Sequence, residues 1–185
     1  ISLQGNAGGT GTLTIAAPNT NTNRTLTLPD NTGTLLSTGS TFAGTGPAFS
    51  AYASAAQTVS NATITKVVFG TEDFDTNSNF ASSTFTPTVA GYYQINFCLT
   101  VNGTTTLTRI ISLLYKNGIS IGRYFDITFP ATTNPAIGTG AKVVYMNGSS
   151  DYLEIYGYLA GSGTLTFSGS TEVTSYFSGS LVRAA

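Results

Sequence analysis

The titratable residues that could perform chemistry gather in one short stretch, "GTEDFDTNSNF" (residues 70–80). It holds Glu72, Asp73 and Asp75. A pair of carboxyl groups can hydrolyse a glycosidic bond, but the two must face each other across a cleft. Three acids in one segment do not meet that requirement. The chain has no histidine, which removes the usual general base near neutral pH and all Ser-His-Asp and Cys-His arrangements. The sequence therefore predicts a protein that is not an enzyme, with no catalytic residues.

The same stretch resembles the start of a calcium loop. Oxygen-bearing side chains alternate there as the first ligands of such a loop do, at Asp73, Asp75, Asn77 and Asn79. The sixth position is Ser78 where glycine is required, and the twelfth is Thr84 where a bidentate glutamate belongs. A solvated turn capped by Asp and Asn side chains explains the stretch equally well, so both interpretations stay open.

Two other features with possible chemistry favour inert roles. Cys98 is the single cysteine, so it cannot form a disulfide within the chain. It lies on the outward side of an expected strand with no basic neighbour in sequence, which favours a buried interface residue over a nucleophile. The glycine-rich "GNAGGTG" (5–11) precedes an expected strand rather than a helix, so it offers no helix N-terminus to hold a phosphate. We expect no cofactor.

The composition excludes several classes of protein. Only 8% of the 185 residues are charged, against a typical ~25%. The net charge of −1 provides no basic field for a nucleic-acid partner. No run of eighteen apolar residues predicts a membrane-spanning segment. The opening "ISLQGN" is typical neither of an initiator methionine nor of a signal peptide, so we expect a piece of a longer protein.

Hydrophobic patterning predicts an all-β chain in two parts. No stretch has sustained helical periodicity, and the 21 glycines also argue against helices. Residues 1–46 form an opening segment that ends in a glycine-rich linker, and residues 47–185 form a domain with regularly spaced strands. Within the opening segment, residues 12–15 and 25–28 alternate as strands do, but each is too shallow to fold alone. We expect neighbouring chains to complete them.

The clearest strand and the clearest turn both belong to the second part. In "GYYQINFCLTV" (91–101), Tyr93, Ile95, Phe97, Leu99 and Val101 share one face and predict the core. Asn117-Gly118 predicts a type I′ hairpin with flanking strands of about seven residues.

The outward faces of the expected strands are neutral and rich in tyrosine. One strand presents Tyr152, Tyr156 and Tyr158, and another presents Tyr176, Ser178, Ser180 and Val182. Interfaces between proteins are enriched in aromatic residues and depleted in charge. Tyrosine also has high β-propensity on its own, but several tyrosines in a chain with so few charges favour an interface.

Several motifs occur in an order that resembles a known family. These are "PAFSAY" (47–52), "FTPTVAGYYQINF" (85–97), "LYKNG" (114–118), "DYLEIYGY" (151–158) and "SYFSGSLV" (175–182). Together they resemble the globular head domain of complement component one subcomponent q, a relative of the tumour necrosis factor jelly roll. The sequence departs from that pattern in "GSSD" (148–151), where the family usually has "GD".

The resemblance implies a ten-stranded antiparallel jelly-roll sandwich that forms a homotrimer through the outer face of one sheet. Carried over, the trimer interface would lie on residues 48–52, 92–100, 152–160 and 175–183. The implied interface residues are Phe49, Tyr52, Tyr92, Gln94, Asn96, Cys98, Tyr152, Tyr156, Tyr158, Tyr176, Ser178 and Ser180.

The opening segment has a second resemblance, to segments of bacteriophage tail fibres and other virion proteins, carried by "GTLTIAAPNTNTNRTLTLPDNTGTLL" (11–36). This implies a short β-rich shaft or collar that contacts other virion proteins, followed by a knob exposed on the particle surface. The expected role is a trimeric tail or head fibre that attaches to a host glycan or protein. Loops on a rigid sandwich carry recognition, and the expected contact residues are Asn77, Asn79, Thr132, Asn134 and Ser162.

Two alternatives keep the jelly roll and change the role. The trimer could be a decoration protein that cements capsid subunits and binds no host. It could also be a secreted lectin-like module, although the collagen-like stalk expected in such a protein is absent from the opening segment.

Overall fold

The computed structural model describes residues 8–10, 21–23, 46–101, 106–132 and 135–185. The chain divides into two units, residues 1–37 and 38–185. All strands of the described residues lie in the second unit, and the strands predicted at 12–15 and 25–28 fall outside the described residues. Among the described residues there is no helix, and hence none able to cross a bilayer.

The described residues form thirteen strands, where ten were expected. Four of the thirteen have only two or three residues: β2, β5, β6 and β12. In chain order the bounds are β1 (Ala48–Tyr52), β2 (Gln57–Val59), β3 (Thr63–Lys66), β4 (Thr71–Asp75), β5 (Phe80–Ala81), β6 (Thr84–Phe85), β7 (Gly91–Val101), β8 (Thr106–Lys116), β9 (Ile119–Thr132), β10 (Ala136–Met146), β11 (Leu153–Ser162), β12 (Leu165–Phe167) and β13 (Tyr176–Ala184).

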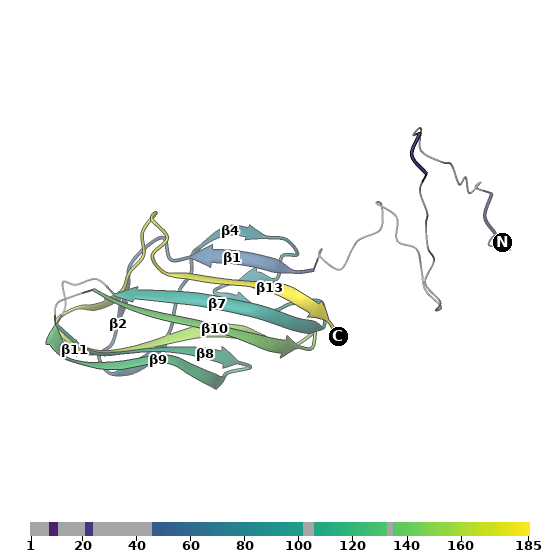
Figure 1. Ribbon diagram of the computed structural model, residues 1–185. Helices are drawn as coiled ribbons and strands as arrows, with labels where there is room; N and C mark the ends of the chain where they lie inside the picture. The colour runs from purple at the N-terminus through teal and green to yellow at the C-terminus, as the bar shows by residue number, and fades with distance from the viewer. Residues whose placement is uncertain (1–7, 11–20, 24–45, 102–105, 133–134) are drawn as a thin grey trace. The chain divides into compact units, whose positions relative to one another are not determined.

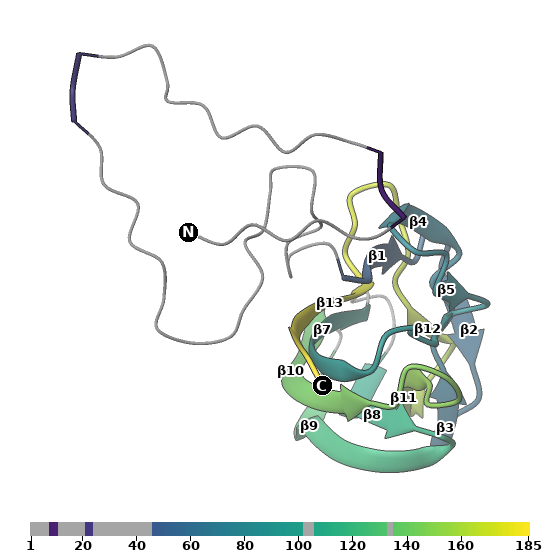
Figure 2. The ribbon, with the colours of Figure 1, turned by 90° about the vertical axis from the view of Figure 1, so that its right-hand side faces the viewer.

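The strands make two antiparallel sheets packed face to face, as the view along the strands shows (Figure 2). In the first sheet β10, β7, β13, β1 and β4 lie side by side in that order. At the C-terminal end of β7 the sheet is extended by β12, which pairs with β7, and by β2, which pairs with β12. The second sheet has the order β5-β6-β11-β8-β9, and β3 also pairs with β11. Strands that are neighbours in space are often distant in sequence, which is the arrangement of a jelly-roll sandwich (Figure 1).

The core fills the space between the sheets and follows the predicted alternation. Tyr93, Ile95, Phe97, Leu99 and Val101 of β7 are each at most 1% exposed, which confirms the predicted core face. Four rings complete an aromatic cluster, two from the same sheet (Phe49 and Phe177) and two from the second sheet (Phe80 and Phe85). Phe49 stacks on Phe80 and Phe85, with ring centroids 4.9 and 4.3 Å away, and Phe177 meets Phe49 edge-on at 4.8 Å.

The predicted hairpin at Asn117-Gly118 is confirmed, with longer strands than expected. Both residues have positive φ, 53° and 77°, as a type I′ turn requires. The flanking strands β8 and β9 have 11 and 14 residues. The Asn117 side chain also ties this turn to a second one, because its amide donates to Asp151 and its oxygen accepts the N–H of Tyr152.

Candidate interaction surface

The outer face of the first sheet is almost free of charge, and we call it the neutral face. It is made by alternate side chains of β10, β7, β13, β1 and β4, whose registers place them in rows across the sheet. Its members are Ile137, Thr139, Ala141, Val143, Tyr145, Tyr92, Gln94, Asn96, Cys98, Thr100, Tyr176, Ser178, Ser180, Val182, Ser50, Tyr52 and Phe74.

Several large apolar side chains on this face are about half exposed. Among the described residues eleven large hydrophobic side chains are exposed, and six of them lie here: Phe74, Tyr92, Ile137, Val143, Tyr145 and Val182, at 44–56% exposure. Monomeric soluble proteins rarely leave contiguous apolar patches of this kind open to water. The neutral face therefore has the character of a buried interface rather than of a free surface.

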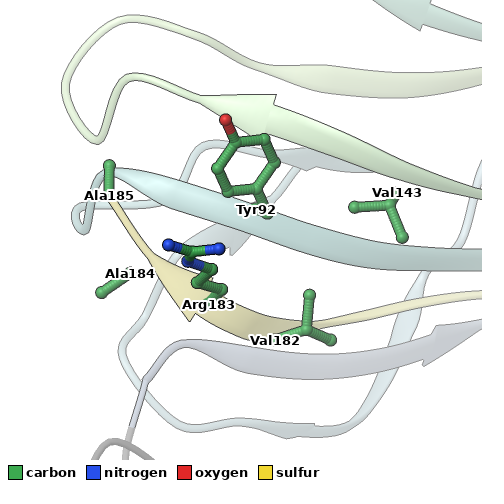
Figure 3. Close-up of a pocket in the computed structure, with 6 residues that line it drawn as sticks. All are labelled: Tyr92, Val143, Val182, Arg183, Ala184 and Ala185. Atoms are coloured by element: carbon green, nitrogen blue, oxygen red, sulfur yellow. The ribbon is translucent and has the colours of Figure 1, made fainter.

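Two hollows are set into the neutral face. The larger, of about 610 Å³, lies at the C-terminal end of β13 and is lined by Tyr92, Val143, Val182 and the last three residues, 183–185. Figure 3 shows Tyr92, Val143 and Val182 projecting from three neighbouring strands beside the guanidinium of Arg183. The smaller, of about 410 Å³, opens over Gly140.

The outer face of the second sheet has the opposite character, and we call it the ion-paired face. Asp126 of β9 binds both Arg109 of β8 at 2.8 Å and Arg123 at 2.6 Å. Chiefly through the hydrogen bond from Arg109, these contacts lower the pKa of Asp126 to about 2. On β11, Glu154 pairs with Lys66 of β3 at 2.6 Å. Charges that compensate one another and remain partly exposed are typical of a surface left in water.

Three of the predicted interface tyrosines belong to this second surface. Tyr156 and Tyr158 lie on β11, which pairs with β8 and β3 and not with the first sheet. Tyr156 stacks on Tyr115 with ring centroids 4.1 Å apart, and Arg109 lies over the ring of Tyr158 at 5.8 Å. Tyr152 precedes β11, and its N–H is bound by the hairpin residue Asn117. The prediction that residues 152–160 share one face with 92–100 and 175–183 is wrong.

Phe49 is a second correction. It was predicted at the interface, but it is 1% exposed and its ring belongs to the core cluster. Ala51 is buried with it, so the outward residues of β1 are Ala48, Ser50 and Tyr52. The other eight predicted interface residues gather on the neutral face: Tyr52, Tyr92, Gln94, Asn96, Cys98, Tyr176, Ser178 and Ser180.

The contribution of β10 and β4 to this face was not predicted from the sequence. Ile137, Val143 and Tyr145 supply half of the exposed apolar side chains of the neutral face, and Phe74 adds one at the opposite edge. The signal was present in "AIGTGAKVVYM" (136–146), where Ile137, Thr139, Ala141, Val143 and Tyr145 alternate. Gly138, Gly140 and Lys142 occupy the inward positions in the middle of β10, between the buried Ala136 and Val144, and this gap in the apolar inward side chains hides the period of two.

The predicted contact loops do not meet at one tip. Ser162 pairs with Thr106 at the start of β8, and Thr132 pairs with Leu107, so both lie at one end of the sandwich. Asn77 follows β4 at the other end, where Thr76 binds the backbone of Ala48 and β13 finishes. Asn134 lies outside the described residues, and so does residue 133, which follows Thr132. Asn79 is only 6% exposed, so its side chain is unavailable to a partner.

The oxygens of the acidic segment are used within the protein. Asp75 accepts the N–H groups of Asn77 at 3.3 Å and Phe80 at 2.7 Å, and Asn79 accepts the N–H of Thr88 at 3.1 Å. Asp73 instead accepts the Ser50 hydroxyl at 2.8 Å. These contacts support the capped-turn interpretation over the calcium loop. In the described part of the chain no three His, Cys, Asp or Glu residues gather into a possible metal site.

Cys98 lies within the neutral face and is 8% exposed. Burial raises the pKa of its thiol, and a weak contact with the Thr100 hydroxyl at 3.9 Å opposes that rise only in part. The thiol is therefore protonated near neutral pH, which agrees with an inert side chain.

No protein-family model matches the sequence, and no curated protein matches it. Solved structures do. The globular domain of the zebrafish complement 1qA protein is 19% identical, covers 76% of this chain and 99% of its own, and superposes with a TM-score of 0.57. Murine APRIL is 9% identical with a TM-score of 0.54 over 74% of this chain and 99% of its own. The chain has the jelly-roll fold of these heads. At such low identity the likeness concerns the fold alone.

Proposed function

We propose that this chain is a trimeric structural protein of a bacteriophage particle, whose jelly-roll knob attaches non-covalently to a host surface. Three copies pack their neutral faces together, and the ion-paired faces remain in water. Three weak contact sites on one rigid trimer then gain apparent affinity by acting together.

The neutral face is the observation that carries the assembly. Six half-exposed apolar side chains lie on it, while three of the four ion pairs among the described residues lie on the ion-paired face. If the chain were a monomer, both outer faces would meet water and both would be expected to carry charge. The resemblance to trimeric heads supports the same arrangement.

The opening segment supports the virion role. Its "GTLTIAAPNTNTNRTLTLPDNTGTLL" resembles recurrent segments of phage fibres, and neighbouring copies in a trimer would supply partners for its shallow strands. The role is binding rather than catalysis, because the chain lacks histidine and the acids of β4 hold a turn and a serine instead of facing each other. A capsid-cementing role is the alternative that keeps the same trimer.

Two measurements test the proposal. Light scattering of the full chain at micromolar concentration is expected to give three times 19.1 kDa, and the mass of one chain would overturn it. Antibody labelling of particles in the electron microscope then separates the roles: label on tails or vertices supports attachment, whereas even coverage of the shell supports cementing.

A further inference from the structure

One of the four ion pairs among the described residues lies away from the ion-paired face. Lys116 ends β8, and its ammonium group lies 2.7 Å from the carboxylate of Asp151, in the loop between β10 and β11. The two side chains are 22% and 11% exposed. The carboxylate also accepts the side-chain amide of Asn117 at 2.8 Å and the backbone N–H of Asn147 at 3.0 Å. These three contacts hold the ammonium group of Lys116 in a fixed position.

The same ammonium group reaches from the second sheet to the first. It donates to the backbone carbonyl of Tyr145 on β10 at 2.8 Å and lies over the Tyr145 ring, 5.8 Å from its centroid. A cation this close to an aromatic face is attracted to it. The ring of Tyr145 meets that of Tyr92 on β7, with centroids 5.5 Å apart, and we call these two residues the tyrosine pair. Lys116 thus connects the buried carboxylate of Asp151 to the tyrosine pair.

The tyrosine pair belongs to the neutral face. Both side chains are 44% exposed, and Tyr92 lines the larger hollow together with Val143 and Val182 (Figure 3). Tyrosine contributes strongly to many protein interfaces, because its ring buries a large area and has few rotatable bonds. An exposed side chain still loses rotamer freedom when a partner covers it. Rings that Lys116 already holds in place lose less of this freedom, so their burial gives a larger net gain in affinity.

We propose that Lys116 and Asp151 are positioning residues for assembly, because their ion pair fixes the tyrosine pair in the orientation that a second copy of this chain buries. The proposal rests on the trimer of the proposed function and names two side chains outside the neutral face on which its affinity depends. A second copy is the expected occupant, since the tyrosine pair continues the apolar surface of Val143 and Val182. The contact needs no opposite charge from the partner, because Lys116 is already paired.

A double-mutant cycle on the full chain tests this coupling. One change is Lys116→Met with Asp151→Asn, which removes both charges together and so leaves no unpaired buried ion. The other is Tyr145→Leu, which removes the ring. Light scattering across a concentration series gives the dissociation constant of the trimer. Each change alone is expected to raise this constant at least about tenfold. Both together are expected to raise it by much less than the product of the two effects, because Lys116 acts through the ring.

The matched control removes an ion pair of the ion-paired face, by Lys66→Met with Glu154→Gln. Lys66 and Glu154 lie 2.6 Å apart and are 31% and 12% exposed, close to the values of the first pair. Their other hydrogen bonds go to Thr84 and Tyr156, away from the neutral face. The dissociation constant of this variant is expected to stay within about twofold of wild type. Lys116→Arg is expected to keep the wild-type affinity, because a guanidinium can pair with a carboxylate and lie over a ring.

The failure of the positioning role and the failure of the trimer give different results. Additive effects in the cycle, or an equal loss of affinity in the control or in Lys116→Arg, would overturn the positioning role and leave the trimer intact. An unchanged dissociation constant in Tyr145→Leu would also overturn it. The mass of a single chain for wild type would overturn the trimer itself. Lys116→Gln keeps a donor for Asp151 and completes the same cycle if circular dichroism shows that the double replacement does not fold.

Discussion

Charge introduced on the neutral face should dissociate the assembly without unfolding the chain. Val143→Glu is the sharpest such change, because Val143 is 50% exposed in the single chain. A surface substitution of this kind changes the free energy of unfolding by less than about 0.5 kcal/mol. In the proposed trimer the same carboxylate would be removed from water, and even with Arg183 lining the same hollow its desolvation costs about 3 kcal/mol per copy. Three copies lose about 9 kcal/mol, so the dissociation constant of the trimer rises by about a million-fold.

The matched control is Ile64→Glu. Ile64 is 46% exposed and pairs with Tyr158 at the outer side of the second sheet, so the same aliphatic-to-acid change occurs on the ion-paired face. Light scattering across a concentration series and thermal unfolding by circular dichroism would be run on both variants. We expect Val143→Glu to give a folded single chain and Ile64→Glu to remain trimeric. If the two variants dissociate alike, or Val143→Glu stays trimeric at nanomolar concentration, the assignment of the interface to the neutral face is refuted.

Three further predictions concern individual side chains. Phe49→Ala should lower the free energy of unfolding by about 3–5 kcal/mol, because Phe49 contacts three other rings in the core. Urea denaturation measures this change, and a loss under about 1 kcal/mol would contradict the core position of Phe49. Burial would raise the pKa of Asp151, but hydrogen bonds from Lys116, Asn117 and Asn147 lower it overall. A carboxylate whose pKa is depressed on folding stabilises the native state above its unfolded pKa of about 3.9 and loses that contribution as pH falls through the folded pKa. Wild type should therefore lose stability below pH ~4, and Asp151→Asn should be less stable at pH 7 and lose less on acidification; an equal acid loss in both would exclude Asp151 as the group involved. Finally, the Cys98 thiol should react with a thiol reagent at pH 8 only after denaturation, and rapid labelling of the native protein would contradict its burial.

Local patterns were enough to predict the individual elements. The alternation of β7 identified five core side chains, and Asn117-Gly118 identified a hairpin whose two residues have positive φ. Both signals act over a few residues, through the pleat of one strand and the backbone of one turn. The jelly roll itself was predicted from ordered motifs, and the structural likeness to complement-type and APRIL heads supports it.

The assignment of strands to sheets could not be predicted in the same way. The tyrosines of β11 and the neutral side chains of β7 have the same local pattern, yet the two strands pair with different neighbours. A strand's alternation says which residues share a face and nothing about which sheet that face belongs to. Pairing depends on contacts such as Glu154 with Lys66, 88 positions apart, and no short pattern encodes them. Phe49 was misplaced for a related reason, since its face depends on packing against Phe80, Phe85 and Phe177.

The uneven placement of charge gives the two outer faces different tendencies to associate. Only 8% of its residues are charged. Five of them form ion pairs on one face: Arg109, Arg123, Asp126, Lys66 and Glu154. That face can meet water, whereas a second copy docking on it would have to desolvate ion pairs that are already satisfied, which is unfavourable. The neutral face carries no such penalty and gains by burial of its half-exposed apolar side chains. Association through the neutral face is therefore favoured, and association through the ion-paired face is opposed. This difference in affinity between the two faces gives the association its specificity.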